Sequence, residues 1–245
     1  MTVHFIGAGP GAADLLTVRA VSLIASSPVC VYAGSYIGAD VLAHCPPEAT
    51  LIDSQRLDLD QITEHLVMAH RNGHDVARLC SGDPSIYSAL AEQARRLDRA
   101  GVPWDVTPGV PAYAAAAALV GRELTVPEIT QTVILTRTQA DSTAMPEAES
   151  LTRLAESRAT LVLHLAIRHV RRLAGELTSA YGPDCPVVVV SRASQPDELV
   201  LRGTLADIAD QVELAGLRQA AVILVGAALA AEGFVESHLY GVRTR

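Results

Sequence analysis

The sequence predicts an α/β fold in two domains, the first over residues 1–123 and the second over residues 124–245. Short β-branched apolar runs alternate with segments of helical apolar spacing, and this alternation breaks near residues 124–130 and then resumes. Strands that alternate with helices are typical of parallel sheets, so we expect a parallel sheet in the first domain. The chain has 245 residues, 49% of them hydrophobic, which is enough for two small cores.

In the first domain, four short apolar runs alternate with four helical segments. The expected strands cover residues 3–6, 29–32, 76–80 and 104–107. The expected helices cover residues 13–26, 59–71, 87–100 and 112–120. Gly73 is a plausible stop for the second helix, and Ser81, Gly82, Asp83 and Pro84 form a turn before the third.

The second domain repeats the alternation with longer polar connections. Its expected strands cover residues 132–136, 160–165, 187–191 and 221–225, and its expected helices cover residues 168–181 and 204–214. Residues 139–150 form a polar loop that runs into a helix, and another polar loop follows residue 191. The longest apolar stretch, residues 220–231, is shorter than the ~20 residues of a membrane span and predicts a buried strand that runs into a helix.

Composition and charge exclude several classes of function. The chain has 19 basic and 27 acidic residues, a net charge of −8, and all of its basic residues are arginine. An acidic chain is a poor candidate for non-specific nucleic-acid binding. Without lysine, the chain has neither a Walker A lysine nor a Schiff-base lysine, whereas arginine suits bidentate binding of carboxylates and phosphates.

The spacing of cysteine and histidine predicts no metal site. The four cysteines lie far apart, at Cys30, Cys45, Cys80 and Cys185. None of them forms a C-x-x-C pair, and Gly73 interrupts the helix between His70 and His74. The first residues lack a basic segment followed by an apolar one, so we expect no signal peptide. Reduced cysteines in a cytoplasmic protein are the simplest interpretation.

A glycine-rich loop, residues 7–12 (GAGPGA), follows the first predicted strand and allows two interpretations. Its spacing matches a dinucleotide-binding fingerprint. Two features weaken that interpretation: Pro10 has no N–H for a pyrophosphate, and no acidic residue ends the second strand to hold a ribose. The other interpretation is a tight turn between strand and helix without a ligand.

The same loop belongs to a longer series of motifs. In order along the chain these are residues 6–11 (IGAGPG) with 15–17 (LLT), 81–87 (SGDPSIY), 107–110 (TPGV), 122–127 (RELTVP) and 131–137 (QTVILTR). Each motif is weak alone, but the ordered series resembles the tetrapyrrole methylase family over nearly the whole chain.

The resemblance implies an N-terminal parallel sheet, a C-terminal mixed sheet, and S-adenosylmethionine bound in a cleft between the two domains, usually in a homodimer. Within the family, residues 32–36 (YAGSY) look like the subgroup that methylates precorrin-4 at C11. Residues 191–198 (SRASQPDE), together with Arg137, Thr138, Met145 and Pro146, also resemble the corrin branch. The expected activity is therefore C-methylation of precorrin-4 to precorrin-5 in cobalamin biosynthesis, with the cobalt-containing substrate as the alternative.

The resemblance also carries site residues onto this chain. As cofactor-binding residues it implies Pro10, Ser81, Gly82, Asp83, Ile86, Pro111, Ala112, Leu165, Ala193 and Ala221. As substrate-binding residues we expect Gly9, Gly11, Ser35, Tyr36, Arg122, Arg137 and Arg192. The arginines are candidates to hold the substrate's carboxylates. A second interpretation of Asp83 is that it caps a helix that begins near Pro84.

No residue is assigned as acid, base, nucleophile or metal ligand. The methyl group of a sulfonium is already electrophilic, so alignment of the reactants is the expected contribution of the protein. Two other classes remain alternatives: a nicotinamide-dependent oxidoreductase that uses the first loop, and a non-catalytic module that senses adenosine. Neither a nucleic acid nor a membrane is an expected partner.

Overall fold

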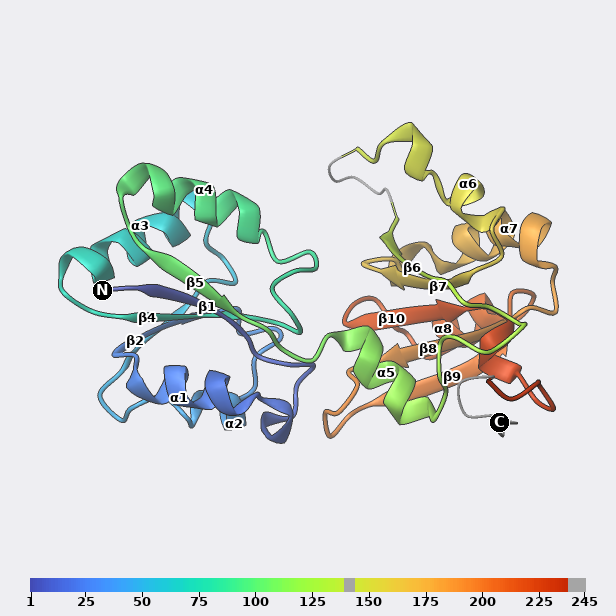
Figure 1. Cartoon of the computed structure of the whole chain (residues 1–245), viewed down its shortest axis with the longest axis horizontal. Coiled ribbons are helices and arrows are strands. Elements are labelled where there is room, and N and C mark those ends of the chain that lie inside the picture. Colours follow the sequence, from blue (N-terminus) through green and yellow to red (C-terminus); the bar gives the residue numbers. More distant parts are fainter. Residues whose placement is uncertain (139–143, 238–245) are drawn as a thin grey trace, which may run out of the picture. The chain divides into compact units, whose positions relative to one another are not determined.

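The structure is a computed structural model that describes residues 1–138 and 144–237. It contains two compact units: unit 1 comprises Met1–Ala115 with Ser194–Pro196, and unit 2 comprises Ala116–Ala193 with Asp197–Arg245. Each unit is built around one five-stranded sheet with helices, so the predicted class of two α/β domains is confirmed (Figure 1). The division between the units falls inside helix α5 (Ala112–Val120), whereas we expect the domain boundary after this helix.

Unit 1 contains a fully parallel sheet in the order β3-β2-β4-β1-β5. Its strands are β1 (Val3–Gly7), β2 (Val29–Tyr32), β3 (Thr50–Asp53), β4 (Val76–Cys80) and β5 (Trp104–Thr107). Its helices are the 3-10 turn η1 (Ala13–Leu15), α1 (Val18–Ser26), α2 (Ala39–Leu42), α3 (Leu59–Arg71), α4 (Leu90–Ala100) and the start of α5. Helices α1 and α2 lie on one face of the sheet and α3 and α4 on the other (Figure 1).

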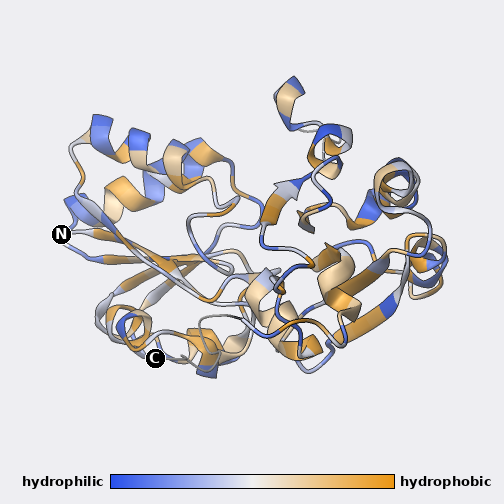
Figure 2. Ribbon diagram, turned by 45° about the vertical axis from the view of Figure 1, so that its right-hand side comes forward, coloured by the Kyte–Doolittle hydropathy of each residue, from blue (hydrophilic) through white to orange (hydrophobic). Residues whose placement is uncertain are grey.

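Each face of this sheet has its own hydrophobic core, because side chains alternate along a strand. Phe5 and Val31 pack with Leu66 of α3 and Leu97 of α4 on one face. On the other face, the core is formed by Ile6, Cys30 and Leu79 with Ala20 and Ile24 of α1 and Val41 of α2. Figure 2 shows the corresponding pattern, with mainly hydrophobic strands and helices that combine hydrophobic with hydrophilic surface.

Unit 2 contains a mixed sheet in the order β6-β7-β10-β8-β9, in which only β6 and β7 pair in parallel. Its strands are β6 (Val133–Arg137), β7 (Thr160–His164), β8 (Pro186–Ser191), β9 (Leu199–Thr204) and β10 (Ala221–Val225). Its helices are η2 (Glu147–Glu149), α6 (Leu151–Ala155), η3 (Ile167–His169), α7 (Val170–Tyr181), α8 (Ile208–Leu214) and η4 (Ala227–Ala230). The main core lies between one face of this sheet and α6, α7 and α8.

Several predicted elements begin in the wrong place. The segment 13–26 is not one helix: after η1, α1 begins at Val18 because the side chain of Thr17 accepts a hydrogen bond from the Ala20 N–H. Helix α4 begins at Leu90, since the residue before it, Ala89, has a left-handed φ of 55°. The predicted helix 204–214 begins at Ile208, and the predicted helix 168–181 is preceded by η3 and begins at Val170.

Two strands are absent from the sequence-based prediction. Strand β3 was not expected at all, and β9 lies in the segment that we interpret as a polar loop after residue 191.

Part of the other polar loop, residues 139–143, lies outside the described residues. Among the residues that the structure describes, no helix is long and apolar enough to cross a bilayer.

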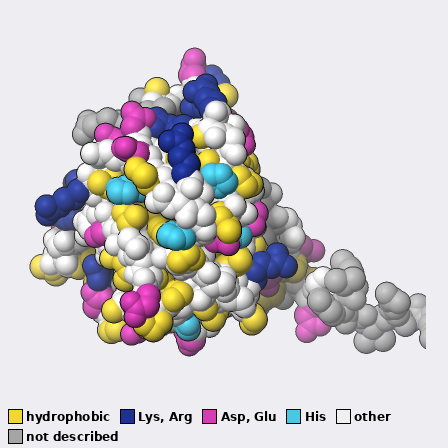
Figure 3. All heavy atoms as spheres, turned by 90° about the vertical axis from the view of Figure 1, so that its left-hand side faces the viewer, with side chains coloured by type: hydrophobic (Ala, Val, Ile, Leu, Met, Phe, Trp, Pro, Cys, Tyr) yellow, Lys and Arg dark blue, Asp and Glu magenta, His cyan; other side chains and the backbone are white. Residues whose placement is uncertain are grey.

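The face of unit 1 that Figure 3 shows carries no segregated charge. Figure 3 looks at the side where β1 begins, and arginine, acidic and histidine side chains are interspersed there with hydrophobic ones. In unit 1, the Nδ1 of His4 on β1 lies 2.9 Å from the carboxylate of Asp105 on β5.

Candidate functional site

The motif loops of unit 1 meet at one edge of its sheet. Because β1, β2, β4 and β5 are parallel, the loops after all four strands leave from the same edge. Strand β1 lies between β4 and β5, so the glycine-rich loop after Gly7 lies between the loop after Cys80 and the loop after Thr107. The first three family motifs are therefore neighbours in space, although they are far apart in sequence.

Glycines let the three loops approach one another more closely than other residues would allow. A Cβ atom added at Gly7 would lie 2.4 Å from the Gly109 nitrogen, and one added at Gly109 would lie 2.3 Å from the Gly82 carbonyl oxygen. Both distances involve backbone atoms, which cannot turn aside as a flexible side chain can. Gly7 and Gly109 are thus required by the packing of the loops themselves.

Backbone hydrogen bonds continue between the first two loops beyond the ends of the strands. Gly9 and Gly82 exchange two N–H···O bonds, of 3.1 and 2.7 Å, and both glycines have φ near 70°. The Ala8 N–H donates to the Cys80 carbonyl at 2.8 Å. Gly9 and Pro10 are buried, whereas Ser81 is exposed. This pairing fixes the backbone on either side of Ser81, next to Asp83.

Asp83 joins the second loop to the third. Its Oδ2 accepts the Gly109 N–H at 2.8 Å, and its Oδ1 accepts the Ser85 N–H at 2.8 Å and the Ser85 hydroxyl. Burial raises the pKa of the Asp83 carboxyl, but these hydrogen bonds outweigh it and hold the pKa below its usual value. Helix α4 begins only at Leu90, so the interpretation of Asp83 as a helix cap is wrong.

The remaining cofactor-binding candidates of unit 1 lie on the same three-loop edge. Ile86, whose N–H donates to the Asp83 carbonyl at 3.3 Å, is half-buried in the second loop. Pro111 and Ala112 are half-buried where the third loop enters α5, and the Pro111 carbonyl accepts the N–H groups of Ala114 and Ala115. The sequence-based assignments in unit 1 thus form one group.

The loop that carries Ser35 and Tyr36 is fixed by a residue that the sequence did not single out. Oδ1 of Asp53, at the end of β3, accepts the Gly34 N–H and the Gln55 N–H at 2.9 Å each. These two backbone donors lower the pKa of Asp53. Ser35 is half-buried, and Tyr36 is 40% exposed after a turn in which its N–H donates to the Ala33 carbonyl. Only the short run of residues 50–53 ending in Asp53 signals this role.

A short segment from late in the chain packs against the first loop. Residues Ser194–Pro196 belong to unit 1, where the Ser194 Oγ accepts the Ala12 N–H at 3.1 Å and the Gln195 Nε2 donates to the Pro10 carbonyl at 3.2 Å. A Cβ atom at Gly11 would lie 2.4 Å from the Gln195 side chain. Gly11 therefore leaves room for Gln195, a contact that sequence reasoning missed because the two residues lie so far apart along the chain.

In unit 2, most of the predicted site residues also share one edge of the sheet. Arg137 ends β6 opposite His164 of β7, and Leu165 follows directly. Strand β8 runs in the same direction as β7, since both pair antiparallel with β10, so Arg192 and Ala193 leave from this edge too. Ala221 begins β10 opposite Ser191. Arg192 forms an ion pair with Asp197 at 2.9 Å, and Ala193 is buried.

Left-handed backbone conformations gather at this edge of unit 2. Leu165, Arg192 and Ala220 have φ between 50° and 54°, although none of them is glycine. Such conformations store strain and are frequent at ligand sites. Leu165 is in addition 65% exposed, which leaves a large apolar side chain uncovered at the end of β7.

Arg122 is the one predicted site residue of unit 2 that the structure separates from the others. It lies in a pocket with Pro186, where β8 begins, and with Gly203, near the end of β9. This is the edge of the sheet opposite to Arg137, Leu165 and Arg192. The Arg122 guanidinium donates to the Ala231 carbonyl at 3.2 Å.

Comparisons with known proteins agree with this arrangement of motifs. A family model described as Tetrapyrrole (Corrin/Porphyrin) Methylases matches residues 2–209. A precorrin-4 C(11)-methyltransferase from Rhodococcus erythropolis is 60% identical over 240 residues, which are 98% of this chain and 96% of that protein.

Two solved structures are similar over nearly their whole length. The structure of a cobalamin biosynthetic enzyme, cobalt precorrin-4 methyltransferase, matches with a TM-score of 0.90 at 39% identity, over 93% of this chain and 95% of the other. A uroporphyrin-III C-methyl transferase from Thermus thermophilus, in complex with S-adenosylhomocysteine, matches with a TM-score of 0.79 at 27% identity, over 94% and 99%.

Proposed function

Because the chain belongs to the tetrapyrrole (corrin/porphyrin) methylase family, we propose that it transfers a methyl group from S-adenosylmethionine to C11 of precorrin-4, giving precorrin-5 in cobalamin biosynthesis. One observation carries the proposal: Gly9, Gly82, Asp83 and Gly109, from three separate motifs, are joined by hydrogen bonds at one edge of a parallel sheet. The relative named for this reaction supports the choice of substrate.

The residues of unit 1 suit the polar groups of S-adenosylmethionine. A carboxylate has about four lone-pair positions, and Asp83 uses three of them within the protein. The remaining position can accept a hydrogen bond from a hydroxyl or ammonium group of the cofactor. Ser81 is exposed beside it, and Gly82 leaves backbone without a side chain for close approach. We assign Pro10, Ile86, Pro111 and Ala112 to the same site.

In unit 2, the exposed Leu165 provides an apolar surface for the cofactor, and Ala193 and Ala221 complete this part of the site. A strained, exposed leucine is costly for a surface that faces only water, which supports its assignment to ligand contact.

We assign the acetate and propionate groups of the substrate to Arg137 and Arg192 in unit 2 and its ring to the loops of Gly9, Gly11, Ser35 and Tyr36 in unit 1. Guanidinium groups bind carboxylates through paired, charge-assisted hydrogen bonds. Arg192 already has Asp197 as a partner, so a substrate carboxylate would share or replace that contact. Arg122 is left out of this group because it lies at the other edge of its sheet.

When bound, S-adenosylmethionine supplies an electrophilic methyl group on its sulfonium. The protein's contribution is positioning: the hydrogen-bonded loops hold Ser81 and Asp83 in one place, and the arginines orient the substrate. Alignment of this kind can supply up to ~7–11 kcal/mol of a reaction barrier. We assign no residue as nucleophile, acid or base.

The same geometry also suits the cobalt-containing substrate, and the similar cobalt precorrin-4 methyltransferase favours keeping that candidate. The higher identity to the relative named for the metal-free substrate places precorrin-4 first.

We further propose that the chain acts as a homodimer in the cytoplasm. The family resemblance supports the dimer, and four cysteines without a disulfide support a reducing compartment.

The deciding experiment supplies the purified protein with isotopically labelled S-adenosylmethionine and, in parallel, with precorrin-4 or its cobalt complex. We expect label at C11 of the metal-free product, detected by mass spectrometry and NMR. Faster labelling of the cobalt complex would reverse the order of the two substrates, and labelling of neither would contradict the proposed reaction.

Calorimetric titration with S-adenosylhomocysteine and with NAD tests the cofactor separately. We expect the unmodified chain to bind S-adenosylhomocysteine and not NAD. A double variant, Arg137→Gln with Arg192→Gln, should bind the tetrapyrrole more weakly and keep its affinity for S-adenosylhomocysteine. Binding of NAD instead would support an oxidoreductase. Sedimentation of the full chain tests the dimer.

A further inference from the structure

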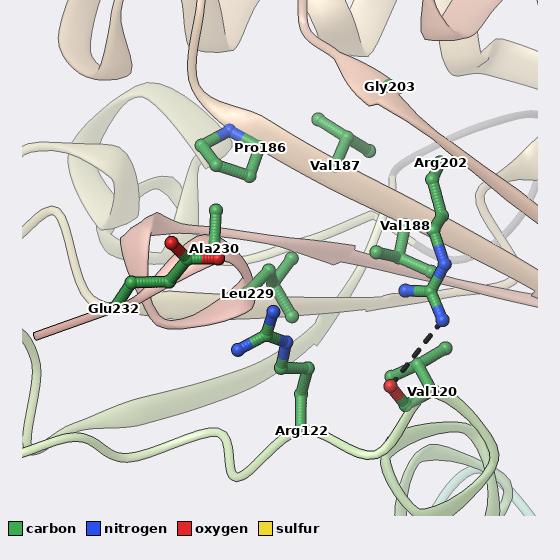
Figure 4. Close-up of a pocket in the computed structure, with 10 residues that line it drawn as sticks. All are labelled: Val120, Arg122, Pro186, Val187, Val188, Arg202, Gly203, Leu229, Ala230 and Glu232. Atoms are coloured by element: carbon green, nitrogen blue, oxygen red, sulfur yellow. Dashed lines mark hydrogen bonds between the residues drawn. The ribbon is translucent and has the colours of Figure 1, made fainter.

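A pocket of about 330 Å³ lies in unit 2, at the end of the sheet where β8 begins and β9 ends (Figure 4). The volume corresponds to about ten water molecules, so it can hold a small organic molecule. All of its lining residues belong to unit 2. The pocket lies at the sheet edge opposite to Leu165, Arg137 and Arg192, so it is separate from the residues assigned to methyl transfer.

Two guanidinium groups reach into this space from different walls (Figure 4). Arg122 comes from the segment after α5, and Arg202 comes from β9. Each donates one hydrogen bond to a backbone carbonyl: Arg122 donates to Ala231 at 3.2 Å, and Arg202 donates to Val120 at 3.4 Å. A guanidinium carries five N–H donors, so most of the donors of both groups remain for another acceptor.

Neither arginine is neutralised by a carboxylate of the described part of the chain. The ion pairs of residues 1–138 and 144–237 include neither Arg122 nor Arg202. Glu232 is exposed on the wall of the pocket without pairing with either of them. The lining therefore carries a net charge of about +1, in a chain whose total charge is −8.

The rest of the lining is apolar. Val188 lies directly opposite Arg202 in the β8–β9 register, so both side chains are on the same face of the sheet. That face is opposite to the one covered by α7 and α8, where Val187 and Val189 point. Leu229 of η4 lies beside the Arg122 guanidinium in Figure 4 and is buried like Val188.

We propose that this pocket binds a small organic carboxylate, with the carboxylate held by Arg122 and Arg202 and the apolar body against Val188 and Leu229. A carboxylate matches the planar fork of a guanidinium, and a single negative charge balances the net charge of the lining. The apolar surface selects an acid with a hydrocarbon body over a bare inorganic anion, because burial of that body adds to the affinity.

Benzoate is the probe for this site, with two matched controls. Benzamide has the same shape without the charge, and acetate has the charge without the ring. The full chain, labelled with ¹⁵N at arginine, is titrated with each compound while the Nε–H signals are followed by NMR. We expect saturable shifts of the Arg122 and Arg202 signals with benzoate, and weaker binding of both controls.

Substitutions locate the binding. Arg202→Gln and Arg122→Gln should each weaken benzoate binding about tenfold, because each removes a charge-assisted contact. Arg168→Gln is the matched control: Arg168 is exposed like Arg202 and also donates to one backbone carbonyl, that of Arg218, but it does not line the pocket. This variant should bind benzoate as the unmodified chain does.

Ala230→Phe keeps both charges and fills the pocket from an exposed wall residue, so it should also abolish the shifts even if the arginine variants lose stability. Absence of benzoate binding overturns the proposal, as does binding that Arg202→Gln leaves unchanged. A change of sedimentation in the arginine variants, without benzoate binding, would show that the pocket receives a side chain of a second copy and would likewise overturn it. None of these measurements depends on methyl transfer.

Discussion

The two sheet edges to which we assign ligand binding are built in different ways. In unit 1, three loops are held by direct backbone contact, with Gly7 and Gly109 at distances that exclude a Cβ atom, and by one carboxylate, Asp83. In unit 2, the corresponding edge has left-handed residues that carry full side chains, Leu165 and Arg192 among them.

The difference has an energetic meaning. The close glycine contacts of unit 1 stabilise the folded unit, so the loop geometry and the stability depend on the same atoms. A left-handed leucine or arginine costs ~1–2 kcal/mol, so these conformations at the edge of unit 2 lower the free energy of unfolding. Substitutions in unit 1 should therefore damage stability and ligand binding together, whereas substitutions in unit 2 should separate the two.

The largest effect is expected for Gly109→Ala. Its Cβ atom would lie 2.3 Å from the Gly82 carbonyl oxygen and 2.7 Å from the Gly7 carbonyl carbon, so two loops must move. We expect the free energy of unfolding of the chain to fall by about 3 kcal/mol, with loss of S-adenosylhomocysteine binding. Urea unfolding and calorimetry measure the two effects.

Gly175→Ala is the matched control for this substitution. Gly175 lies within helix α7 of unit 2, and a Cβ atom there would meet nothing within 4 Å. Alanine should stabilise this helix by ~0.5–1 kcal/mol and leave ligand binding unchanged. Equal stability of the Gly109→Ala variant and the unmodified chain would contradict the close contact of the loops.

Asp83→Ala should have the next largest effect. It removes the acceptor of the Gly109 N–H and of Ser85, and hydrogen bonds to a charged group contribute ~1.5–3 kcal/mol. We expect S-adenosylhomocysteine to bind at least about tenfold more weakly. Asp98→Ala, which removes the acceptor of the Trp104 Nε1–H at 2.8 Å, should lower stability without changing that affinity. A normal affinity of the Asp83→Ala variant would refute its role at the site.

The same carboxylate gives a smaller, pH-dependent effect. The pKa of Asp83 in the folded chain lies below its unfolded value of ~3.9, so its stabilising contribution is complete above that value and is lost as the pH falls through the folded pKa. The difference in urea midpoint between the unmodified chain and Asp83→Asn should therefore shrink between about pH 5 and pH 3. A constant difference would mean that folding does not lower the pKa of Asp83.

These contrasts also explain what the sequence could predict. The edge of unit 1 was predictable because its geometry demands glycine and proline at fixed spacing, and these residues form the motifs through which the family resemblance assigned Gly82 and Asp83. The conformation of Leu165 was not, since no residue type announces a left-handed leucine. Its assignment came from the family resemblance, with a looser alignment than in unit 1.

The two missed strands, β3 and β9, have a common cause. Both are edge strands, and neither contains a buried residue that would give an apolar run in the sequence. Because β3 was missed, no sequence pattern connected Asp53 with Gly34. The pocket residue Arg202 was missed for the same reason, as it lies on β9.

The smallest effect on stability, and the sharpest test of the comparison, is expected for Leu165→Gly. Glycine adopts a φ of 54° without strain, and Leu165 is 65% exposed, so little buried surface is lost. The gain from relieved strain offsets the greater freedom of glycine in the unfolded chain, and the free energy of unfolding should change by less than ~1 kcal/mol. The affinity for S-adenosylhomocysteine should nevertheless fall several-fold, because the apolar contact is gone.

Arg158→Gly separates strain from ligand contact. Arg158 also has a left-handed φ, 51°, and is exposed, but it precedes β7 at the end opposite to Leu165. Its replacement should change stability as little as Leu165→Gly does and leave the affinity for S-adenosylhomocysteine unchanged. If both variants keep full affinity, the strain at Leu165 does not serve the ligand, and the edge of unit 2 contributes to binding through other residues than those proposed.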